Sequence, residues 1–293
     1  MTLKNKNEFG FRCSDKKNLK SKDKSQKWDQ WFAGLIDGDG CFYINQQREI
    51  SFELTTHTSD ARIVHNIKNQ LKAGSVKLRS GSNSIRYRVK QRATIIDIVH
   101  RINGKVRNST RCGQLKEVCQ LLNIAYILPA YQVVIEDSYL AGLFDADGTI
   151  AISVSKTTQA DSQKSKVAGQ IDRLRHSKGY NQLYLKITSV NQSNLNFIVS
   201  SYGFGKIYVE KSPYKNGKLT KPKYHWTINS YEEIVLFYEY LKNYRLKSVK
   251  MHRVRLSLHY FYYKKLKYHL KNENTVEYKI WSKFCNSWFK YMV

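Results

Sequence analysis

Two pairs of aspartates recur in this chain in the same local setting and are its clearest candidates for chemistry. Asp37 and Asp39 lie in the stretch W-F-A-G-L-I-D-G-D-G-C-F, and Asp145 and Asp147 lie in Y-L-A-G-L-F-D-A-D-G-T-I. Carboxylate oxygens, with backbone carbonyls and water, are the ligands that Mg²⁺ prefers in proteins. Two such ions near one another suit displacement at a phosphate. The pattern therefore predicts metal-dependent phosphoryl chemistry at a site that both stretches share.

Each stretch predicts a short apolar helix that ends at its second aspartate. Gly40 and Gly148 lie where a glycine commonly ends a helix, so Asp39 and Asp147 would be the last helical residues. The first aspartate of each pair points to another side of the helix, where local capping is its expected role.

Small residues on one face of each helix predict that the two helices pack against each other. Without large side chains, two helix backbones can approach closely. Side-by-side packing would bring Asp39 and Asp147 to one end of the interface. The residues four apart on these faces are Gly34 and Gly38 in the first helix, and Gly142 and Ala146 in the second.

The spacing of the two stretches predicts two related halves. The offset between Asp39 and Asp147 is 147 − 39 = 108 residues, which is the size of a small domain. The expected organisation is a basic flexible arm over 1–27, a first half over 28–129, a linker over 130–137 and a second half over 138–293. A polar segment over 158–180 is read as a long loop, which either follows a nucleic-acid backbone or is a tolerated insertion.

Both stretches resemble the LAGLIDADG motif of homing endonucleases of the single-chain, two-motif type. The alternative of a calcium loop fails, because no glutamate stands at the twelfth loop position. The resemblance implies an α+β fold with two pseudo-twofold-related αββαββα units, whose antiparallel sheets form a DNA-binding saddle. It also implies that Mg²⁺, or Mn²⁺ or Ca²⁺ at the same sites, is bound by Asp39 and Asp147 with the backbone carbonyls of Gly38 and Ala146.

The resemblance further implies a basic residue near each scissile phosphate, around the end of the fourth strand of each half. Lys90 or Arg92 would take this place in the first half. Residues 227–230, the corresponding part of the second half, contain no lysine or arginine, and Lys223 is the nearest in the sequence.

Alternating apolar and polar residues predict strands with one core face and one polar, mostly basic face. A solvated outer face usually mixes charges, whereas the first half places one acid, Glu53, among several bases, which favours contact with phosphates and bases of DNA. The candidate DNA contacts are Tyr43, Asn45, Gln47, Ser51, Glu53, Thr55, Lys77, Arg79, Arg86, Arg88 and Lys90 in the first half, and Ser153, Ser155, Thr157, Tyr184, Lys186, Thr188, Lys206, Tyr208, Lys223, His225 and Thr227 in the second.

The composition points to a polyanionic partner, and its candidate explanations are nucleic acid, an anionic membrane surface and simple solubility. The chain of 293 residues has 50 lysines and arginines against 23 acids, a net charge of +27. No stretch approaches 18 uninterrupted apolar residues, so no membrane span is expected. Five cysteines without a C-x-x-C pair predict a reducing intracellular compartment and no zinc site. The resemblance implies an organelle, mitochondrion or chloroplast, and a monomer.

Three functions fit these observations. The first is a site-specific DNA endonuclease that makes a staggered double-strand break in a long target and so promotes intron homing. The second is a maturase, which would use the same scaffold to bind intron RNA as a splicing cofactor. The third is a DNA-binding protein without cleavage. Both motif aspartates are present, which favours the endonuclease.

Overall fold

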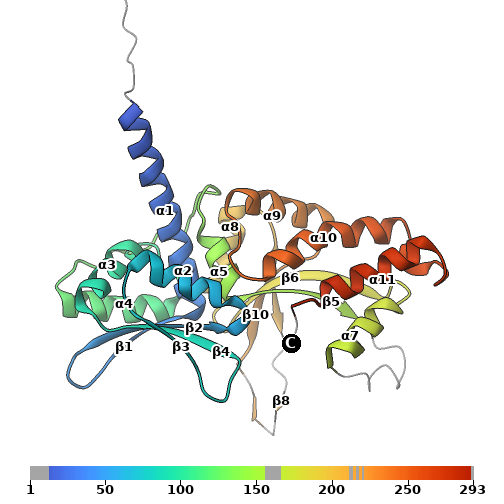
Figure 1. Cartoon of the computed structure of the whole chain (residues 1–293). Coiled ribbons are helices and arrows are strands. Elements are labelled where there is room, and N and C mark those ends of the chain that lie inside the picture. Colours follow the sequence, from blue (N-terminus) through green and yellow to red (C-terminus); the bar gives the residue numbers. More distant parts are fainter. Residues whose placement is uncertain (1–12, 156–165, 211–213, 216–217, 220, 292–293) are drawn as a thin grey trace, which may run out of the picture.

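Two four-stranded antiparallel sheets lie beneath a layer of helices (Figure 1). This computed structural model describes residues 13–155, 166–210, 214–215, 218–219 and 221–291. The strand order is β1-β2-β4-β3 in the first sheet and β5-β6-β10-β7 in the second. Each half thus repeats the same order of helices and strands, which confirms the predicted α+β fold.

The first half begins with the long helix α1, which runs directly into the first strand. Its elements are α1 (Cys13–Asp39), β1 (Gly40–Ile44), β2 (Ile50–His57), the 3-10 turn η1 (Thr58–Asp60), α2 (Ala61–Leu71), β3 (Ser75–Leu78), β4 (Ser84–Val89), α3 (Arg92–Ile102) and α4 (Ser109–Leu122). A connection without helix or strand, residues 123–138, joins the halves.

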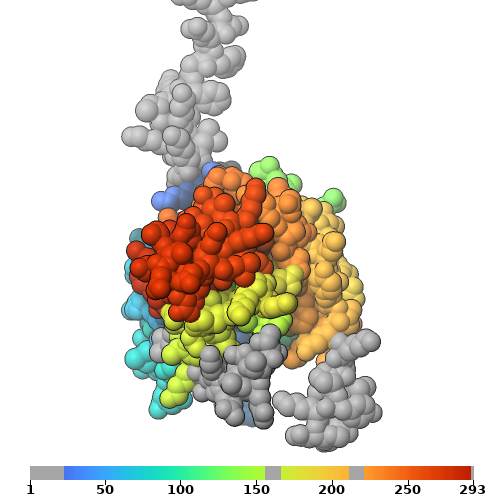
Figure 2. Space-filling view, turned by 90° about the vertical axis from the view of Figure 1, so that its right-hand side faces the viewer, coloured from blue at the N-terminus to red at the C-terminus, as the bar shows by residue number. Residues whose placement is uncertain are grey.

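The second half repeats this order with an extra helix between its first two strands, a short extra strand pair before its last strand, and one further α-helix at its end. Its elements are α5 (Tyr139–Asp147), β5 (Gly148–Val154), α7 (Lys166–Arg175), β6 (Asn181–Ser189), α8 (Ser193–Tyr202), β7 (Lys206–Glu210), β8 (Tyr214–Lys215), β9 (Lys218–Leu219), β10 (Lys223–Ile228), α9 (Tyr231–Asn243), α10 (Lys250–Lys265), η2 (Tyr268–Leu270) and α11 (Val276–Trp288). Figure 2 shows the outer end of this half, where the red C-terminal segment lies above the yellow-green segment that holds α7.

Two segments differ from the sequence-based expectation. Helix α1 begins at Cys13, inside the predicted flexible arm of residues 1–27. Residues 13–33 contain no glycine or proline, and lysines are good helix formers, so the helix extends well beyond the apolar motif. Helix α7 lies in the predicted loop of residues 158–180. Thr157 and residues 1–12 lie outside the described residues.

Alternation along the strands separates a core face from an outer face in each sheet. Phe52, Leu54 and Tyr87 are fully buried beneath the helices of the first half. Trp226 and Leu185 are their buried counterparts in the second. Because successive strand residues point to opposite sides, the intervening polar residues must lie on the face away from the helices.

The two halves meet through α1 and α5, which pack side by side at very short range. A Cβ atom added to Gly34 would lie 2.1 Å from the carbonyl oxygen of Tyr139, and one added to Gly142 would lie 1.8 Å from that of Trp31. A Cβ atom added to Gly38 would lie 2.4 Å from the Cβ atom of Ala146. Residues later in α1 meet residues later in α5: Gly34 faces Tyr139, and Gly38 faces Ala146. The two helices therefore run in the same direction and end side by side.

Reciprocal hydrogen bonds join the halves beside this contact. The Tyr139 hydroxyl donates to the buried Asp37 carboxylate, and the Trp31 indole Nε1 donates to Asp145 over 2.8 Å. The backbone N–H groups of Arg107 and Ser248 also donate to Asp37 and Asp145, over 2.7 and 2.9 Å. The prediction that Asp37 and Asp145 cap their own helices is therefore wrong. Each accepts hydrogen bonds from the opposite motif helix and from a loop of its own half.

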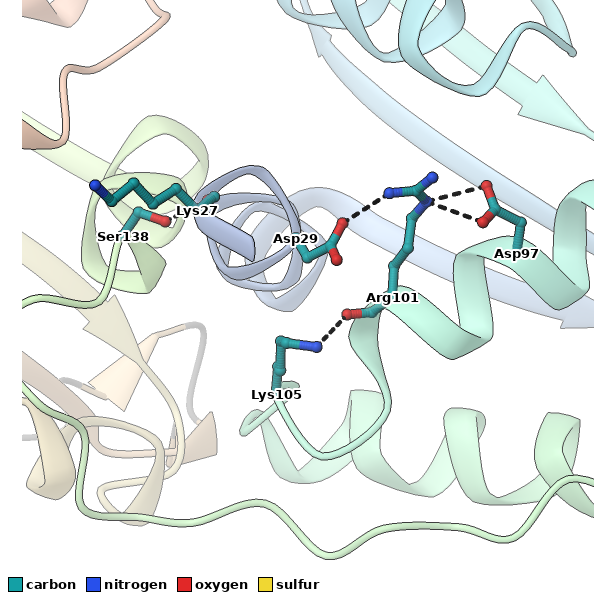
Figure 3. A network of polar contacts seen from close by, with 6 residues as sticks. All are labelled: Lys27, Asp29, Asp97, Arg101, Lys105 and Ser138. Atoms are coloured by element: carbon teal, nitrogen blue, oxygen red, sulfur yellow. Dashed lines mark hydrogen bonds and ion pairs between the residues drawn. The ribbon is translucent and has the colours of Figure 1, made fainter. Parts of the chain in front are cut away.

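An ion-pair network fixes the middle of α1 to its own half (Figure 3). The Arg101 guanidinium on α3 contacts Asp29 on α1 over 2.9 Å and Asp97 over 3.0 Å. The same guanidinium lies 5.5 Å from the ring centroid of Trp28.

Within the parts of the chain described, no helix is long and apolar enough to span a membrane.

The close helix contact predicts a large effect of one methyl group. Gly142→Ala should lower the free energy of unfolding by about 3 kcal/mol or more, because the new Cβ atom meets backbone that cannot move aside. Urea denaturation followed by circular dichroism measures this change. Gly113→Ala is the matched control, because nothing lies within 4 Å of its Cβ position on α4. It should raise stability by about 0.5–1 kcal/mol. Equal effects of the two substitutions would contradict the close packing.

Candidate active site and nucleic-acid interface

Asp39 and Asp147 lie together where α1 and α5 end and enter β1 and β5. A Cβ atom added to Gly38 would lie 3.1 Å from the Oδ2 atom of Asp147, so this carboxylate rests against the end of the opposite helix. The negative charge of Asp147 also reaches Asp39 and raises its pKa. The structure thus brings the two motif aspartates to one site, on the side of the molecule where the strands begin.

Burial and mutual repulsion make these carboxylates difficult to ionise. Burial, followed by the charge of Asp147, raises the pKa of Asp39 to about 7. Burial also raises the pKa of Asp147, against which the charges of Lys250 and Arg111 act. Asp147 is the more solvent-exposed of the two aspartates. A bound cation would favour the ionised form of both groups.

Lys250, the first residue of α10, is a site residue that the sequence analysis missed. Its ammonium donates hydrogen bonds to the carbonyl oxygens of Asp145 and Ala146, both over 2.7 Å, and to that of Phe144 over 3.1 Å. These are the last carbonyls of α5, where a cation is favoured by the helix dipole. Burial lowers the pKa of Lys250, and the surrounding carboxylates oppose this shift.

Arg111 contributes a second cation from the corresponding helix of the first half. It lies near the start of α4, and its charge lowers the pKa of both Asp39 and Asp147. Its Nη1 atom donates to Gln114 over 3.1 Å, which fixes the guanidinium along the helix. No short sequence signal marks Arg111 or Lys250, because each reaches the carboxylates only through the tertiary fold.

The donor groups of this site fit a divalent cation. Asp39 and Asp147 offer hard oxygen ligands, and neither forms an ion pair in the described part of the chain. No group of three or more histidine, cysteine or acidic side chains within the described residues could hold a metal, so backbone carbonyls and water would have to complete the coordination. The predicted carbonyl ligand of Ala146 already accepts a hydrogen bond from Lys250 over 2.7 Å.

The basic residues predicted to lie near the scissile phosphates are not brought to these carboxylates. Tyr87 is level with Gly40 in the first sheet, since both pair across β2 with Leu54. Lys90 comes three residues after Tyr87, so it lies roughly 10 Å further along the strand direction than the level of Gly40. It lines a surface pocket with Arg92 and Tyr43 instead. Lys223 is the first residue of β10 and pairs with Glu210 on β7.

The outer face of the first sheet carries the predicted polar row, with two changes. Ser51 is only 6% exposed, because it is a small residue on a central strand between longer neighbours. Asn45 lies in the β1–β2 loop, where its side chain binds Glu49 over 2.8 Å. Gln47 lies in the same loop and is exposed. On or at the ends of the strands, the exposed residues are Tyr43, Lys77, Arg79 and Lys90, and the partly buried ones are Glu53, Thr55, Arg86 and Arg88.

The single acid on this face pairs with two of the bases. Glu53 contacts Arg86 over 3.1 Å and Arg88 over 2.5 Å across neighbouring strands. This arrangement holds both guanidinium groups on the outer face and leaves a net positive charge there. Neighbouring Lys77 pairs with Arg86 in the strand register and extends the basic row.

The outer face of the second sheet is polar but less basic. His225 stands in the middle of a cross-strand chain, 2.8 Å from the Thr188 hydroxyl and 3.0 Å from the Glu210 carboxylate. The ammonium of Lys186 lies 5.5 Å from the ring centroid of Tyr184. The remaining predicted contacts on or beside this face are Ser153, Ser155, Lys206, Tyr208, Lys223 and Thr227.

Comparisons with known proteins connect this geometry to one family. The family model described as LAGLIDADG endonuclease matches residues 32–121 and 140–265. A probable intron-encoded endonuclease aI2 of Debaryomyces hansenii is 35% identical over 90% of this chain and 38% of its own length. The intron-encoded RNA maturase bI4 of Saccharomyces cerevisiae is 34% identical over 91% of this chain and 37% of its own length. The chain therefore spans less than two fifths of these two relatives.

A further relative is matched over most of its length. The intron-encoded DNA endonuclease ai2a of Dictyostelium discoideum is 26% identical, and the match covers 94% of this chain and 79% of that protein.

Solved structures share the fold at low sequence identity. Meganuclease I-SmaMI, bound to uncleaveable DNA, superposes with a TM-score of 0.62 at 16% identity, over 88% of this chain and 97% of the other. The I-LtrWI LAGLIDADG homing endonuclease, bound to target DNA, gives 0.61 at 16% identity, over 91% and 98%. At this identity the likeness establishes the architecture of two repeated halves.

The raised pKa of Asp39 predicts a pH-dependent gain in stability when its charge is removed. A carboxyl whose pKa rises from 3.8 to about 7 on folding destabilises the protein increasingly as the pH rises through that range. In metal-free buffer, the stabilisation by Asp39→Asn should therefore grow by about 1–2 kcal/mol between pH 5 and pH 8. Urea denaturation at both pH values measures it. Glu117→Gln, an exposed acid on α4, should show no such growth. A gain independent of pH would exclude this electrostatic origin.

Proposed function

This chain belongs to the LAGLIDADG endonuclease family, and from that premise we propose that it is a site-specific DNA endonuclease. It makes a staggered double-strand break in a long target site and thereby promotes homing of the intron that encodes it. The observation that carries this proposal is the position of Asp39 and Asp147, which end two parallel helices at one site between two polar sheet faces.

Asp39 and Asp147 would hold Mg²⁺, or Mn²⁺ or Ca²⁺ in its place, with the carbonyl of Gly38 and with water. The ion would supply a Lewis acid and an activated water for attack on a phosphodiester bond. The protein contributes rigidity, because both carboxylates stand on helices locked at their glycines. It also partly buries Asp39, and the lower local polarity strengthens the interaction of that carboxylate with a cation.

Lys250 and Arg111 take the place of the basic residues that the sequence placed at Lys90, Arg92 and Lys223. Both approach the carboxylates from the starts of equivalent helices, α10 and α4. They are not equivalent in detail, because Lys250 is held by three carbonyls of α5 and Arg111 by a glutamine. This difference supports unequal rates of cutting for the two DNA strands.

Double-stranded DNA is the proposed substrate of the outer sheet faces, and the protein acts as a monomer with two halves. Support comes from the net charge of +27 and from the exposed bases of the first sheet. An organellar location, more narrowly the mitochondrion, is supported by relatives named as intron-encoded products of cox1.

A second candidate function is that of an RNA maturase. One specific observation favours it: a relative of that name is 34% identical over 91% of this chain. The two functions are compatible, since the carboxylate site and the sheet faces leave the rest of the basic surface free for another nucleic acid.

Removal of one motif carboxylate tests the cleavage proposal. Asp39→Asn should slow double-strand cleavage by about 10²- to 10³-fold or more, because a charge that holds the metal is lost. Affinity for the same DNA in Ca²⁺ should change less than about threefold. The assay uses DNA that spans the joined exons flanking the reading frame, with Mg²⁺ and gel analysis of products. Undiminished cutting by the variant would remove Asp39 from its proposed role.

Removal of the α10 lysine tests the proposed role of Lys250. Lys250→Met should slow cleavage of one strand about 10²-fold and cause nicked DNA to accumulate. Lys264→Met is a matched control on the same helix, because its ammonium also donates to a backbone carbonyl, that of Asn181, over 2.8 Å. Both variants should lose similar stability, about 1–2 kcal/mol, but only the first should change the product pattern. Identical products from both would refute a role for Lys250.

A further inference from the structure

A basic cavity lies at the far end of the motif helices from the carboxylates. It has a volume of about 570 Å³ and is lined by α1, the last turn of α2, the start of α5 and the α9–α10 loop. In Figure 1, α1 rises away from the strands, so its N-terminal part lies on the side of the molecule opposite the sheets. Neither the proposed DNA contacts nor the carboxylate site use this cavity.

The charged groups that line the cavity are all cationic. They are Lys24, Lys27, Arg245 and Lys247. Lys27 pairs with Asp23 over 2.9 Å. Lys24 and Arg245 are exposed, and neither has an acidic partner within the described residues. An anion would therefore meet two unpaired cations at the mouth of the cavity.

Lys247 is the most buried of these four cations. Its ammonium lies 3.3 Å from the ring centroid of Trp31 and 6.0 Å from that of Trp28. No described carboxylate lies within ion-pair distance of this ammonium. Burial lowers the pKa of Lys247 to about 8. The lysine is thus stabilised by aromatic faces. The charge of the nearby Asp145, which accepts the Lys247 backbone N–H over 2.9 Å, opposes the lowering of its pKa without forming an ion pair with the ammonium.

Aromatic rings line the same cavity. Trp28 and Trp31 contribute theirs from α1, and Tyr244 contributes a third from the α9–α10 loop. Such rings offer flat surfaces on which unpaired bases can stack.

We propose that this cavity binds a single-stranded segment of RNA. Cations beside aromatic rings are the groups that proteins use for unpaired nucleotides, whose phosphates and bases they contact together. A cavity of this size takes a small ligand or an extruded nucleotide, whereas a duplex requires the extended surface of the sheets. The relative named as an RNA maturase, aligned over 91% of this chain, also favours RNA. This inference does not require that the protein cleaves DNA.

Binding of a labelled RNA by the full chain tests the proposal. The probe is a fluorescein-labelled, unstructured RNA of about 15 nucleotides, and the readout is fluorescence anisotropy. The variant Lys24→Glu/Arg245→Glu should weaken RNA binding at least about tenfold, because two phosphate contacts become repulsive. The matched control is Lys279→Glu/Lys283→Glu, which makes the same change in net charge at exposed positions of α11. It should weaken binding less than about threefold.

Duplex DNA serves as the second probe and distinguishes the cavity from the sheet faces. A 30-base-pair duplex should bind the cavity variant and the control variant with equal affinity. In the unmodified protein, the RNA should also quench tryptophan fluorescence, and Trp28→Phe should reduce that quenching. Equal loss of RNA affinity in both charge variants would overturn the proposal, since it would reveal only general attraction. A selective loss of duplex DNA binding in the cavity variant would overturn it too, and would assign the cavity to DNA.

Discussion

The contact between α1 and α5 is the constraint on which the other features depend. At Gly34 and Gly142 the opposing backbone lies closer than a Cβ atom allows. Such an approach fixes the rotation and the offset of both helices, because any shift brings a side chain into the contact. Each sheet continues directly from one of these helices, so the position of the two sheets follows from the same contact. The two carboxylates meet because both helices end at the same level.

Electrostatics at this meeting point are unfavourable in the protein alone. Two acids near the ends of two helices face the negative ends of both helix dipoles as well as each other. Lys250 and Arg111 oppose this repulsion from the starts of α10 and α4. The pKa of Asp39 nevertheless stays raised, first by burial and then by the charge of Asp147. A bound cation would relieve the repulsion between the two carboxylates.

The sequence predicted most of the fold because its signals are local. The repeated motif, the alternation of strands such as Ile85 to Val89 and the glycine helix ends each act within a few residues. The acids Asp39 and Asp147 were found in the same way. Lys250 was not found, since it reaches Ala146 across 104 residues of chain through the packing of α10. The helical start of α1 was missed because its lysines carry no apolar periodicity, although they favour a helix.

The exchange of hydrogen bonds between Trp31 and Asp145, and between Tyr139 and Asp37, has a consequence for the history of such a chain. Each half supplies the donor that satisfies the buried acid of the other. Either half made alone would leave an acid without that donor and a helix face of bare backbone open to water. Substitution of Trp31 or Tyr139 therefore affects the buried acid of the other half, so the two copies are constrained together. The two copies can diverge on their outer sheet faces, but the donors and acceptors of this exchange must remain matched to each other.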